Sequence, residues 1–466
     1  MNKKTKVVLL STVLASALVA GETSKAVLTA PVFSEAPYKY VERSITADDG
    51  SFTGYVRMHH IFDDDTDSLI AKVTGSTLGM GLGYGMEVAP GLKAGAEFYG
   101  VMDSGLTDNL PKTGLPKVDN TAFGQFMNTH KDGNELNAGY AWGAHIRYEG
   151  EGYKIQLARS QYDSPLTNIV QITHVPNMYE YARVDGEIFG GKASIGFINK
   201  MAYGSRSQAD FSLIGEKTGT AGMYLNGLIG NLALQPQIVR GNYYSIEDTL
   251  DAGNTDSNGI IQFGYEKKKG MWQFSIWDQY IDDVANNIYV QGTRKFPLGK
   301  GNAVKLSAHV WDQDISNSNY EANYGGTLVG AEALLKLGDF VYKMAVETKD
   351  EGGLLNAWGA NPGYTSSIFS RNQYRSDVDA YKATFVWKAM KGLKFVASIA
   401  DYGQSNMKLS GKSAKVDATE KDIVVVYKPR PDLTFKLFNA NRTSEFDGIG
   451  GKRTMNHTRL ITNFAF

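Results

Sequence analysis

The sequence alternates between apolar residues and small or polar residues with a period of two over much of its length. From 78 to 88 the even positions are Leu, Met, Leu, Tyr, Met and Val, and the odd positions are Gly except for Glu87. Successive side chains of a β-strand point to opposite faces, so this pattern predicts a strand between two different environments. The same alternation recurs at 92–99, 138–149, 304–310 and 433–437. We therefore predict an all-β protein.

Alternation alone also fits a soluble antiparallel sheet with one wetted face. Two further features favour a single transmembrane antiparallel β-barrel. Many alternating runs reach the roughly nine residues that a tilted strand needs to cross a bilayer. Short connections at 89–91, 338–339 and 391–392 alternate with long polar ones such as 103–134 and 349–377. Short periplasmic turns and long extracellular loops are typical of outer-membrane barrels.

The final segment predicts how such a barrel closes. Leu460, Thr462, Phe464 and Phe466 share one face of the expected strand, so the chain ends on an outward aromatic residue. This ending resembles the recognition signal of outer-membrane proteins. Pairing of this strand with the first one would leave no open edge in lipid.

The composition agrees with a strand-rich membrane protein and excludes several other classes. Gly is abundant at 51, Tyr and Phe number 26 and 21, and Pro is scarce at 12. The 48 basic and 49 acidic residues nearly balance, which argues against a nucleic-acid partner. The absence of Cys excludes disulfides, thiolate catalysis and Cys-based zinc sites.

Three regions are predicted along the chain. Residues 1–21 resemble a signal peptide, with a basic head, a short apolar run from Val7 to Ala20 and a small-residue exit. Residues 22–50 lack clean periodicity and are expected to be a periplasmic lead-in. Residues 51–466 form the barrel, with about 18–20 strands by direct counting. The doubtful pair is 223–230 with 232–243, which an excursion within a loop would also explain.

Other functions are weaker predictions. An outer-membrane enzyme would need an activated nucleophile, but none of the seven His residues lies in a catalytic motif that we recognise. We expect no enzyme activity and no cofactor. A soluble exported β-protein stays open as an alternative. The acidic cluster Asp63–Asp67 could hold calcium, although a solvated loop is the favoured interpretation.

The segment 356–372 and its continuation to 382 resemble a long-loop motif of the OprD-like outer-membrane porins, in particular the variety found in epsilon-type proteobacteria. Three other pairs of segments agree with this resemblance: 277–280 with 287–291, 435–442 with 456–460, and 163–166 with 175–179. The residues of the long-loop motif that we single out are Trp358, Tyr364, Arg371 and Arg375.

The resemblance implies an 18-stranded barrel in the outer membrane, often a homotrimer, whose third loop folds inward as a constriction. It implies passive diffusion of small hydrophilic solutes and ions through a water-filled pore. The alternative is a substrate-specific channel for small amino acids or carboxylates. The family has an arginine just before the hydrophobic–Pro step of the third loop. Thr173 and His174 stand there instead, so the family's substrate preference does not transfer directly.

Assigning the apolar face outward predicts which side chains line the lumen. The cations placed there are Arg57, Lys93, His145, Arg147, Lys154, Lys305, His309, Lys382, Lys394, Lys436 and Arg459. The glutamates placed there are Glu87, Glu97, Glu149 and Glu332. Arg159 is an exception, because the alternation puts it on the lipid face. Either it lies at the outer rim or a β-bulge turns it inward.

The third loop is expected between 153–161 and 178–185, and it carries Tyr162, Asp163, Asn168, Gln171 and His174. We hypothesise that Asp163 and His174 lie at the narrowest point of the pore and face Arg147 across the lumen. Charges of both signs across a narrow gap create a transverse field that orients dipolar solutes. The alternative that each is an ordinary solvated residue stays open.

Overall fold

The computed structural model describes residues 49–62, 65–66, 75–104, 106, 138–167, 174–202, 241–250, 255–321, 324–356, 358, 362–409, 412–447 and 452–466. The predicted signal peptide and residues 22–48 of the predicted lead-in lie outside this range. Most of the doubtful pair at 223–243 also lies outside it.

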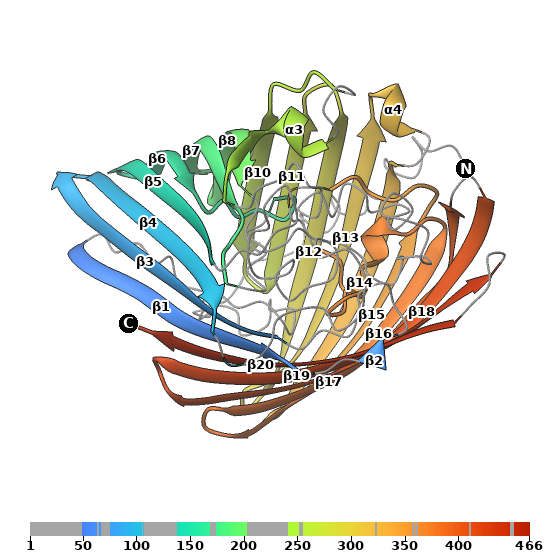
Figure 1. Cartoon of the computed structure of the whole chain (residues 1–466). Helices are drawn as coiled ribbons and strands as arrows, with labels where there is room; N and C mark the ends of the chain where they lie inside the picture. The colour runs from blue at the N-terminus through green and yellow to red at the C-terminus, as the bar shows by residue number, and fades with distance from the viewer. Residues whose placement is uncertain are drawn as a thin grey trace.

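The described residues form one closed antiparallel barrel of 18 strands (Figure 1). The strands of the first half are β1 (Asp49–Ile61), β3 (Gly75–Ala89), β4 (Leu92–Asp103), β5 (Ala138–Gly150), β6 (Tyr153–Ser160), β7 (Met178–Ile188), β8 (Gly191–Ala202), β10 (Ile260–Lys269) and β11 (Trp272–Ile281). Those of the second half are β12 (Ala285–Gly299), β13 (Asn302–Ile315), β14 (Gly326–Leu337), β15 (Phe340–Lys349), β16 (Val378–Met390), β17 (Leu393–Leu409), β18 (Lys412–Arg430), β19 (Leu433–Asp447) and β20 (Lys452–Ala465). The five alternating segments fall in β3, β4, β5, β13 and β19, which confirms the all-β prediction.

Five short elements complete the described fold. They are β2 (Asp65–Thr66), β9 (Tyr243–Ser245), α3 (Ile246–Leu250), α4 (Ser318–Glu321) and the 3-10 turn η4 (Asn372–Tyr374). Because β8 pairs directly with β10, the barrel closes without the doubtful pair at 223–243. The higher figure of 20 from direct counting is thus corrected to the 18 that the resemblance implied. None of the described helices is long and apolar enough to cross a membrane.

The first and last strands close the barrel as predicted. β1 and β20 pair antiparallel from Tyr55 opposite Ala465 to Ile61 opposite Arg459. Gly54 and Phe466 exchange two backbone hydrogen bonds of 2.9 Å. In Figure 1 the blue β1 accordingly runs beside the dark red β20. The pairing of β1 with β20 satisfies the backbone N–H and C=O groups of both strands, which lipid could not hydrogen-bond.

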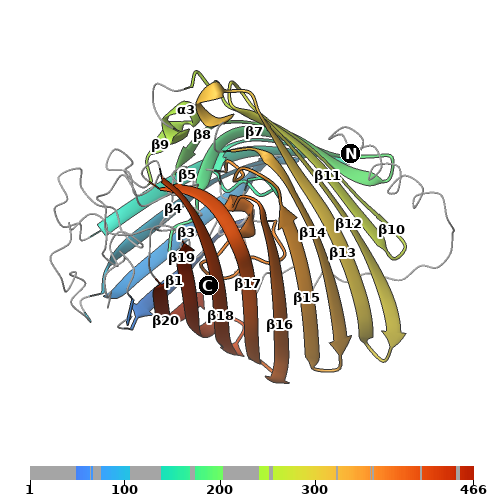
Figure 2. The ribbon, with the colours of Figure 1, turned by 90° about the vertical axis from the view of Figure 1, so that its right-hand side faces the viewer.

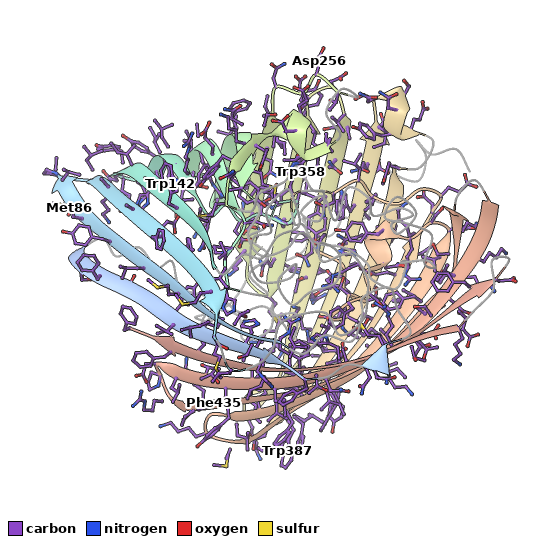
Figure 3. All side chains as sticks on the ribbon, in the orientation of Figure 1. Met86, Trp142, Asp256, Trp358, Trp387 and Phe435 are labelled. Atoms are coloured by element: carbon purple, nitrogen blue, oxygen red, sulfur yellow. The ribbon has the colours of Figure 1, made fainter. Side chains whose placement is uncertain are left out.

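The two faces of the barrel have opposite chemistry. Outward side chains are large and apolar, and Trp142 and Ile146 are 47% and 46% exposed. Between them, His145 points to the inside and is 8% exposed. Figure 3 shows Met86, Trp142 and Trp387 on the outside of the ring and Trp358 within it. An apolar outer face with a polar inner face defines a barrel that contacts lipid.

The height of the apolar band can be followed on β15. Phe340 lies in an aromatic girdle at the short-turn end, where its ring stacks on Trp387 at 6.3 Å. Eight residues later, outward Thr348 donates a hydrogen bond of 2.6 Å to Asp379. At about 3.4 Å per residue and a tilt of about 45°, these levels lie roughly 20 Å apart. This height is close to the ~25 Å apolar band of outer-membrane barrels.

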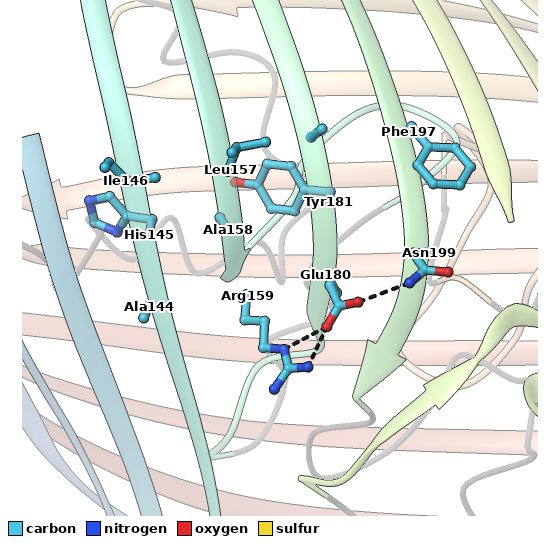
Figure 4. A pocket seen from close by; sticks show the side chains of 11 residues that line it. Ala144, His145, Ile146, Leu157, Ala158, Arg159, Glu180, Tyr181, Phe197 and Asn199 are labelled. Atoms are coloured by element: carbon cyan, nitrogen blue, oxygen red, sulfur yellow. Dashed lines mark hydrogen bonds and ion pairs between the residues drawn. The ribbon is translucent and has the colours of Figure 1, made fainter. Parts of the chain in front are cut away.

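Arg159 lies on the outer face at the edge of this band, the first of the two positions that we considered for it. It forms an ion pair of 2.5 Å with Glu180, and Asn199 donates to the same carboxylate at 2.9 Å (Figure 4). Its guanidinium also lies 5.0 Å from the ring centre of Tyr243. A polar cluster with aromatic neighbours suits the boundary between lipid and water.

The two ends of the barrel differ as the connection lengths predicted. At one end, which we call the short-turn end, two-residue turns join β10 to β11, β12 to β13, β14 to β15, β16 to β17 and β18 to β19. Figure 2 shows several of these turns together at the lower edge of the barrel. The opposite end, which we call the long-loop end, carries α3, α4 and the long connections.

Candidate functional site

Two long connections contact the inner wall of the barrel. One is the third loop, residues 161–177, between β6 and β7. The other, which we call the long loop, comprises residues 350–377 between β15 and β16. Most described side chains of both loops are buried, although both loops connect strand ends. Their contacts with lumen-facing residues define the candidate site.

The third loop begins with an aromatic contact. Tyr162 is 1% exposed, and its ring meets that of Tyr181 edge to face at 4.9 Å. The Arg183 guanidinium lies 4.8 Å from the Tyr162 ring centre. Burial raises the pKa of Tyr162 to about 12, so its phenol stays protonated at neutral pH. A Cβ added at Gly196 would overlap the Tyr162 hydroxyl, so this wall glycine makes room for the ring.

Side-chain amides hold the next part of the third loop and connect it to the long loop. Thr167 Oγ1 accepts hydrogen bonds from the amides of Gln262 and Gln279, the latter at 2.9 Å. Asn287 donates to Gln279 at 3.1 Å and accepts from Gln313 at 2.7 Å. Gln313 also donates to the carbonyl of Leu355 in the long loop at 2.9 Å. This amide row crosses β10 to β13 and joins the two loops.

His174 attaches the other end of the third loop to the opposite wall. Its Nε2 lies 2.8 Å from Thr77 Oγ1, and the Tyr55 hydroxyl donates to its carbonyl at 2.5 Å. Burial, together with Arg57 and Arg459, keeps the pKa of His174 well below its ordinary value. The imidazole is therefore neutral at pH 7 and adds no positive charge to the site.

Gly79 determines how closely His174 approaches the wall. A Cβ added there would overlap the His174 imidazole, whereas a Cβ at Gly100 would make only ordinary contacts of 3.5 Å or more. We therefore expect Gly79→Ala to displace His174 and raise the noise and conductance of single channels. Gly100→Ala is the matched control and leaves both unchanged. Identical traces from the two variants would contradict this role of Gly79.

Two buried carboxylates of the wall hold the long loop. Glu347 accepts backbone hydrogen bonds from Tyr364 at 2.6 Å and Thr365 at 3.2 Å, and one from the Thr365 hydroxyl. His309 Nε2 lies 3.0 Å from the same carboxylate, and its ring stacks on Tyr364 at 4.3 Å. Glu420 accepts from the backbone of residue 369 at 2.8 Å and from Ser370 at 2.6 Å.

Further wall contacts place the residues of the long-loop motif. Tyr402 donates to Thr365 O at 2.7 Å, and the Arg375 guanidinium lies 4.6 Å from the Tyr402 ring centre. Lys382 donates to the carbonyl of Ser366. Arg371 donates to carbonyls of its own loop, including that of residue 370 at 2.9 Å. The carbonyl of Trp358 accepts from Tyr179 at 2.7 Å, so the long loop also contacts the start of β7.

The charged residues predicted near the third loop lie on β5 to β7 and in the loop itself. Arg147, Gln156 and Arg183 are in register on β5, β6 and β7. Arg183 donates to the backbone carbonyl of Asp163 at 3.2 Å, and the Asp163 side chain is exposed. Strand spacing puts Arg147 roughly 10 Å from Arg183 along this row. Asn168 and Gln171 lie outside the described residues.

Carboxylates of the same wall neutralise part of this charge. Arg147 and Lys93 both pair with Glu149 at 2.8 Å. Arg183 pairs with Asp185 at 2.8 Å. The wall beneath Asp163 is therefore a patch of mixed charge.

The wall formed by β19, β20 and β1 is predominantly cationic. Arg57 donates to Asn463 at 3.0 Å, and Arg459 lies 5.3 Å from the Phe438 ring centre. Lys436 lies 5.5 Å from the same ring and within electrostatic reach of both arginines. Lys305, which we also predicted for the lumen, lies near Glu332 and Lys343 on the other side of the barrel.

The sequence interpretation missed the amide row and the two carboxylates that hold the long loop. The only sequence feature that could have indicated the amide row is the lumen-facing position of its members. They are Gln262, Gln279, Asn287 and Gln313. Among the described residues, no group of three or more His, Asp or Glu side chains could hold a metal ion. Asp63, Asp64 and Asp67 of the acidic cluster lie outside those residues, so its calcium site stays untested.

A closed 18-stranded antiparallel barrel with an apolar outer face and loops packed on its inner wall defines a large transmembrane barrel of the porin type. No family model matches the chain, and no curated protein is similar to it in sequence.

Solved structures share this fold. OccK1 (OpdK) of Pseudomonas aeruginosa is 12% identical with a TM-score of 0.67, over 89% of this chain and 98% of that one. OccK9 (OpdG) of the same species is 14% identical with a TM-score of 0.67 over the same shares. OccAB4 of Acinetobacter baumannii is 11% identical with a TM-score of 0.65, over 89% and 97%. These are porins of the OprD family, so the fold that the resemblance implied is confirmed. Assignment to the epsilon-type variety stays a prediction.

Proposed function

We propose that this protein is an outer-membrane porin through which small hydrophilic solutes and ions diffuse passively. The observation that carries the proposal is the polar inner wall, on which two loops are held at several separate points. Third-loop contacts extend from Thr167 at β10 and β11 to His174 at β1 and β3. A loop attached to opposite walls narrows the lumen and sets the size of the solute that passes.

The proposal includes an orientation and an assembly. We place the short turns in the periplasm and the long loops outside the cell, as in other outer-membrane barrels. Export by a cleaved signal peptide at 1–21 and assembly as a homotrimer belong to the same proposal. The solved porin structures support the location through their shared fold.

A planar bilayer experiment tests the function directly. Detergent-purified protein should insert and give stepwise current, and a salt gradient should give a defined reversal potential. Protein that is folded and strand-rich by circular dichroism, yet gives no current steps, would contradict an open pore. That outcome would favour a closed barrel or the enzyme alternative.

A preference for anionic solutes is the second candidate, and the cationic wall favours it. Arg57, Lys436 and Arg459 cluster on adjacent strands, and fixed charges beside a narrow path select the ion of opposite sign. One of the similar structures is the Pseudomonas aeruginosa protein OpdK with vanillate. We propose small carboxylates as the solute class to test first.

Asp163 is expected to act against this preference. Its exposed side chain lies at the mixed-charge wall of Arg147 and Arg183, so it places a negative charge beside these arginines and not across the lumen from them. Asp163→Asn should therefore shift the reversal potential in a salt gradient toward stronger anion preference. An unchanged reversal potential would exclude Asp163 from the narrow part of the pore.

A further inference from the structure

The two ends of the β10–β19 half of the barrel carry opposite charge. At the short-turn end, the turns and the three flanking residues on either side contain many cations and only Asp339 and Asp432 as carboxylates. The cations are Lys267, Lys268, Lys269, Lys300, Lys336, Lys388, Lys391, Lys394, Lys428 and Arg430. We call this set the basic rim.

The basic rim is accessible and local. Lys268, Lys269, Lys391 and Lys428 are all exposed. A hollow of about 560 Å³ beside the β16–β17 turn is lined by Lys388, Lys391 and Lys394 together with Asp339. By contrast, the corresponding turns of β3 to β8 carry cations and carboxylates in nearly equal number. The basic rim is thus a property of one half of the barrel.

The same strands end in carboxylates at the long-loop end. Exposed carboxylates there are Asp256, Asp283, Asp314, Glu321, Glu351, Asp377, Asp379, Glu445 and Asp447. We call this set the acidic rim. Two lysines are exposed at this end too. Lys415 lies opposite Asp447 in the β18–β19 register, and Lys452 pairs with Glu445 at 3.0 Å. Figure 2 shows that the two ends are separated by the full length of the strands.

Fixed charges of opposite sign at the two mouths of a pore make its conductance depend on the direction of the voltage. Counter-ions concentrate at each mouth, so cations gather at the acidic rim and anions at the basic rim. A positive potential at the long-loop end drives the cations from the acidic rim and the anions from the basic rim into the pore. The higher ion concentration in the pore raises its conductance. The reverse potential draws each ion from the mouth where it is depleted, which lowers the conductance.

We infer that this barrel rectifies ion current, with the larger current when the long-loop end is positive. The inference rests on the proposed pore function and adds a direction to it. In the proposed orientation, the barrel passes anions outward and cations inward more readily than the reverse.

The test is a current–voltage curve of protein whose orientation in the bilayer is known. The chain has no Cys, so Ser318→Cys at the start of α4 gives one exposed thiol at the long-loop end. After biotinylation, streptavidin added to one chamber alters the current only where that chamber faces this end. We expect a current ratio at opposite voltages of about two in 0.1 M salt, where the Debye length is about 10 Å. In 1 M salt, with a Debye length of about 3 Å, the ratio should approach one.

Variants assign the effect to the rims. Lys268→Gln, Lys269→Gln, Lys391→Gln and Lys428→Gln together should remove at least half of the asymmetry. Neutralising Asp256, Asp314, Glu321 and Asp447 should act in the same direction. Arg430→Gln with Asp432→Asn is the control, because it removes an exposed ion pair of 2.9 Å within the basic rim without changing the net charge.

Each outcome decides between the claims. Asymmetry that falls with salt and with the rim variants, but not with the control, supports the inference. Symmetric current from open channels overturns it and leaves the porin proposal standing. Asymmetry that survives both sets of variants also overturns it, because pore shape would then be the cause. Folded protein without any current contradicts the porin proposal itself.

Discussion

Glu347→Ala is expected to detach the long loop from the wall. If this loop narrows the proposed pore, single-channel conductance should rise on the order of twofold. The carboxylate is fully buried, accepts from two backbone amides and one hydroxyl, and lies 3.0 Å from His309 Nε2. A buried donor that loses its acceptor costs about 1–3 kcal/mol. The total cost of several donors left without an acceptor exceeds the stabilisation that the remaining contacts of residues 364–365 provide.

The control for this prediction is Glu332→Ala. Glu332 also faces the lumen, on the adjacent strand, and its ion pair of 3.4 Å is with Lys343. Both variants remove one negative charge from the wall, but only Glu347→Ala removes the acceptor of the long loop. Equal conductance changes in the two variants would mean that charge, and not loop attachment, sets the current.

Arg57→Gln with Arg459→Gln is expected to abolish the proposed anion preference and to move the reversal potential in a salt gradient toward the cation side. These guanidiniums lie on adjacent strands near Lys436, so the double substitution removes two of the three cations of this cluster. Selectivity follows the fixed charge at the narrow part of a pore. The effect should exceed that of any single third-loop substitution.

Two exposed lysines provide the comparison. Lys415 and Lys421 both lie exposed on the outer face of β18, so Lys415→Gln with Lys421→Gln removes the same charge outside the lumen. Heat-modifiable migration in gels should show that both double variants remain folded barrels. A reversal potential that shifts as much in the lysine variant would show that the cationic wall does not determine selectivity.

The strands could be predicted because lipid on one side and polar surroundings on the other leave a period-two pattern. His145 between Trp142 and Ile146 is such a case, and the structure places it inside as predicted. The excess of the direct count came from 223–243, which alternates locally although the barrel closes without it. An alternating pattern indicates that a segment lies between two environments. It does not show that the segment belongs to the barrel sheet.

The contacts that hold the loops could not be predicted in the same way. Gln279 touches Thr167 and Asn287 because of the strand register and the path of the third loop. At a lumen-facing position, an amide that joins two loops has the same sequence signature as one that contacts water. Glu347 was not singled out for the same reason, although its neighbours in the long-loop motif were recognised.

The wall glycines restrict how this pore could be retuned by mutation. Gly79 accommodates His174, Gly196 accommodates Tyr162, and Gly330 accommodates His309. The two residues of each pair come from distant parts of the sequence but are in direct contact. A larger residue in place of the glycine would therefore require a smaller facing side chain. A wider or narrower passage would therefore be reached through coordinated exchanges between a strand and its facing side chain. Libraries that randomise both members of a pair should yield folded barrels with new passage properties more often than libraries that randomise the loops alone.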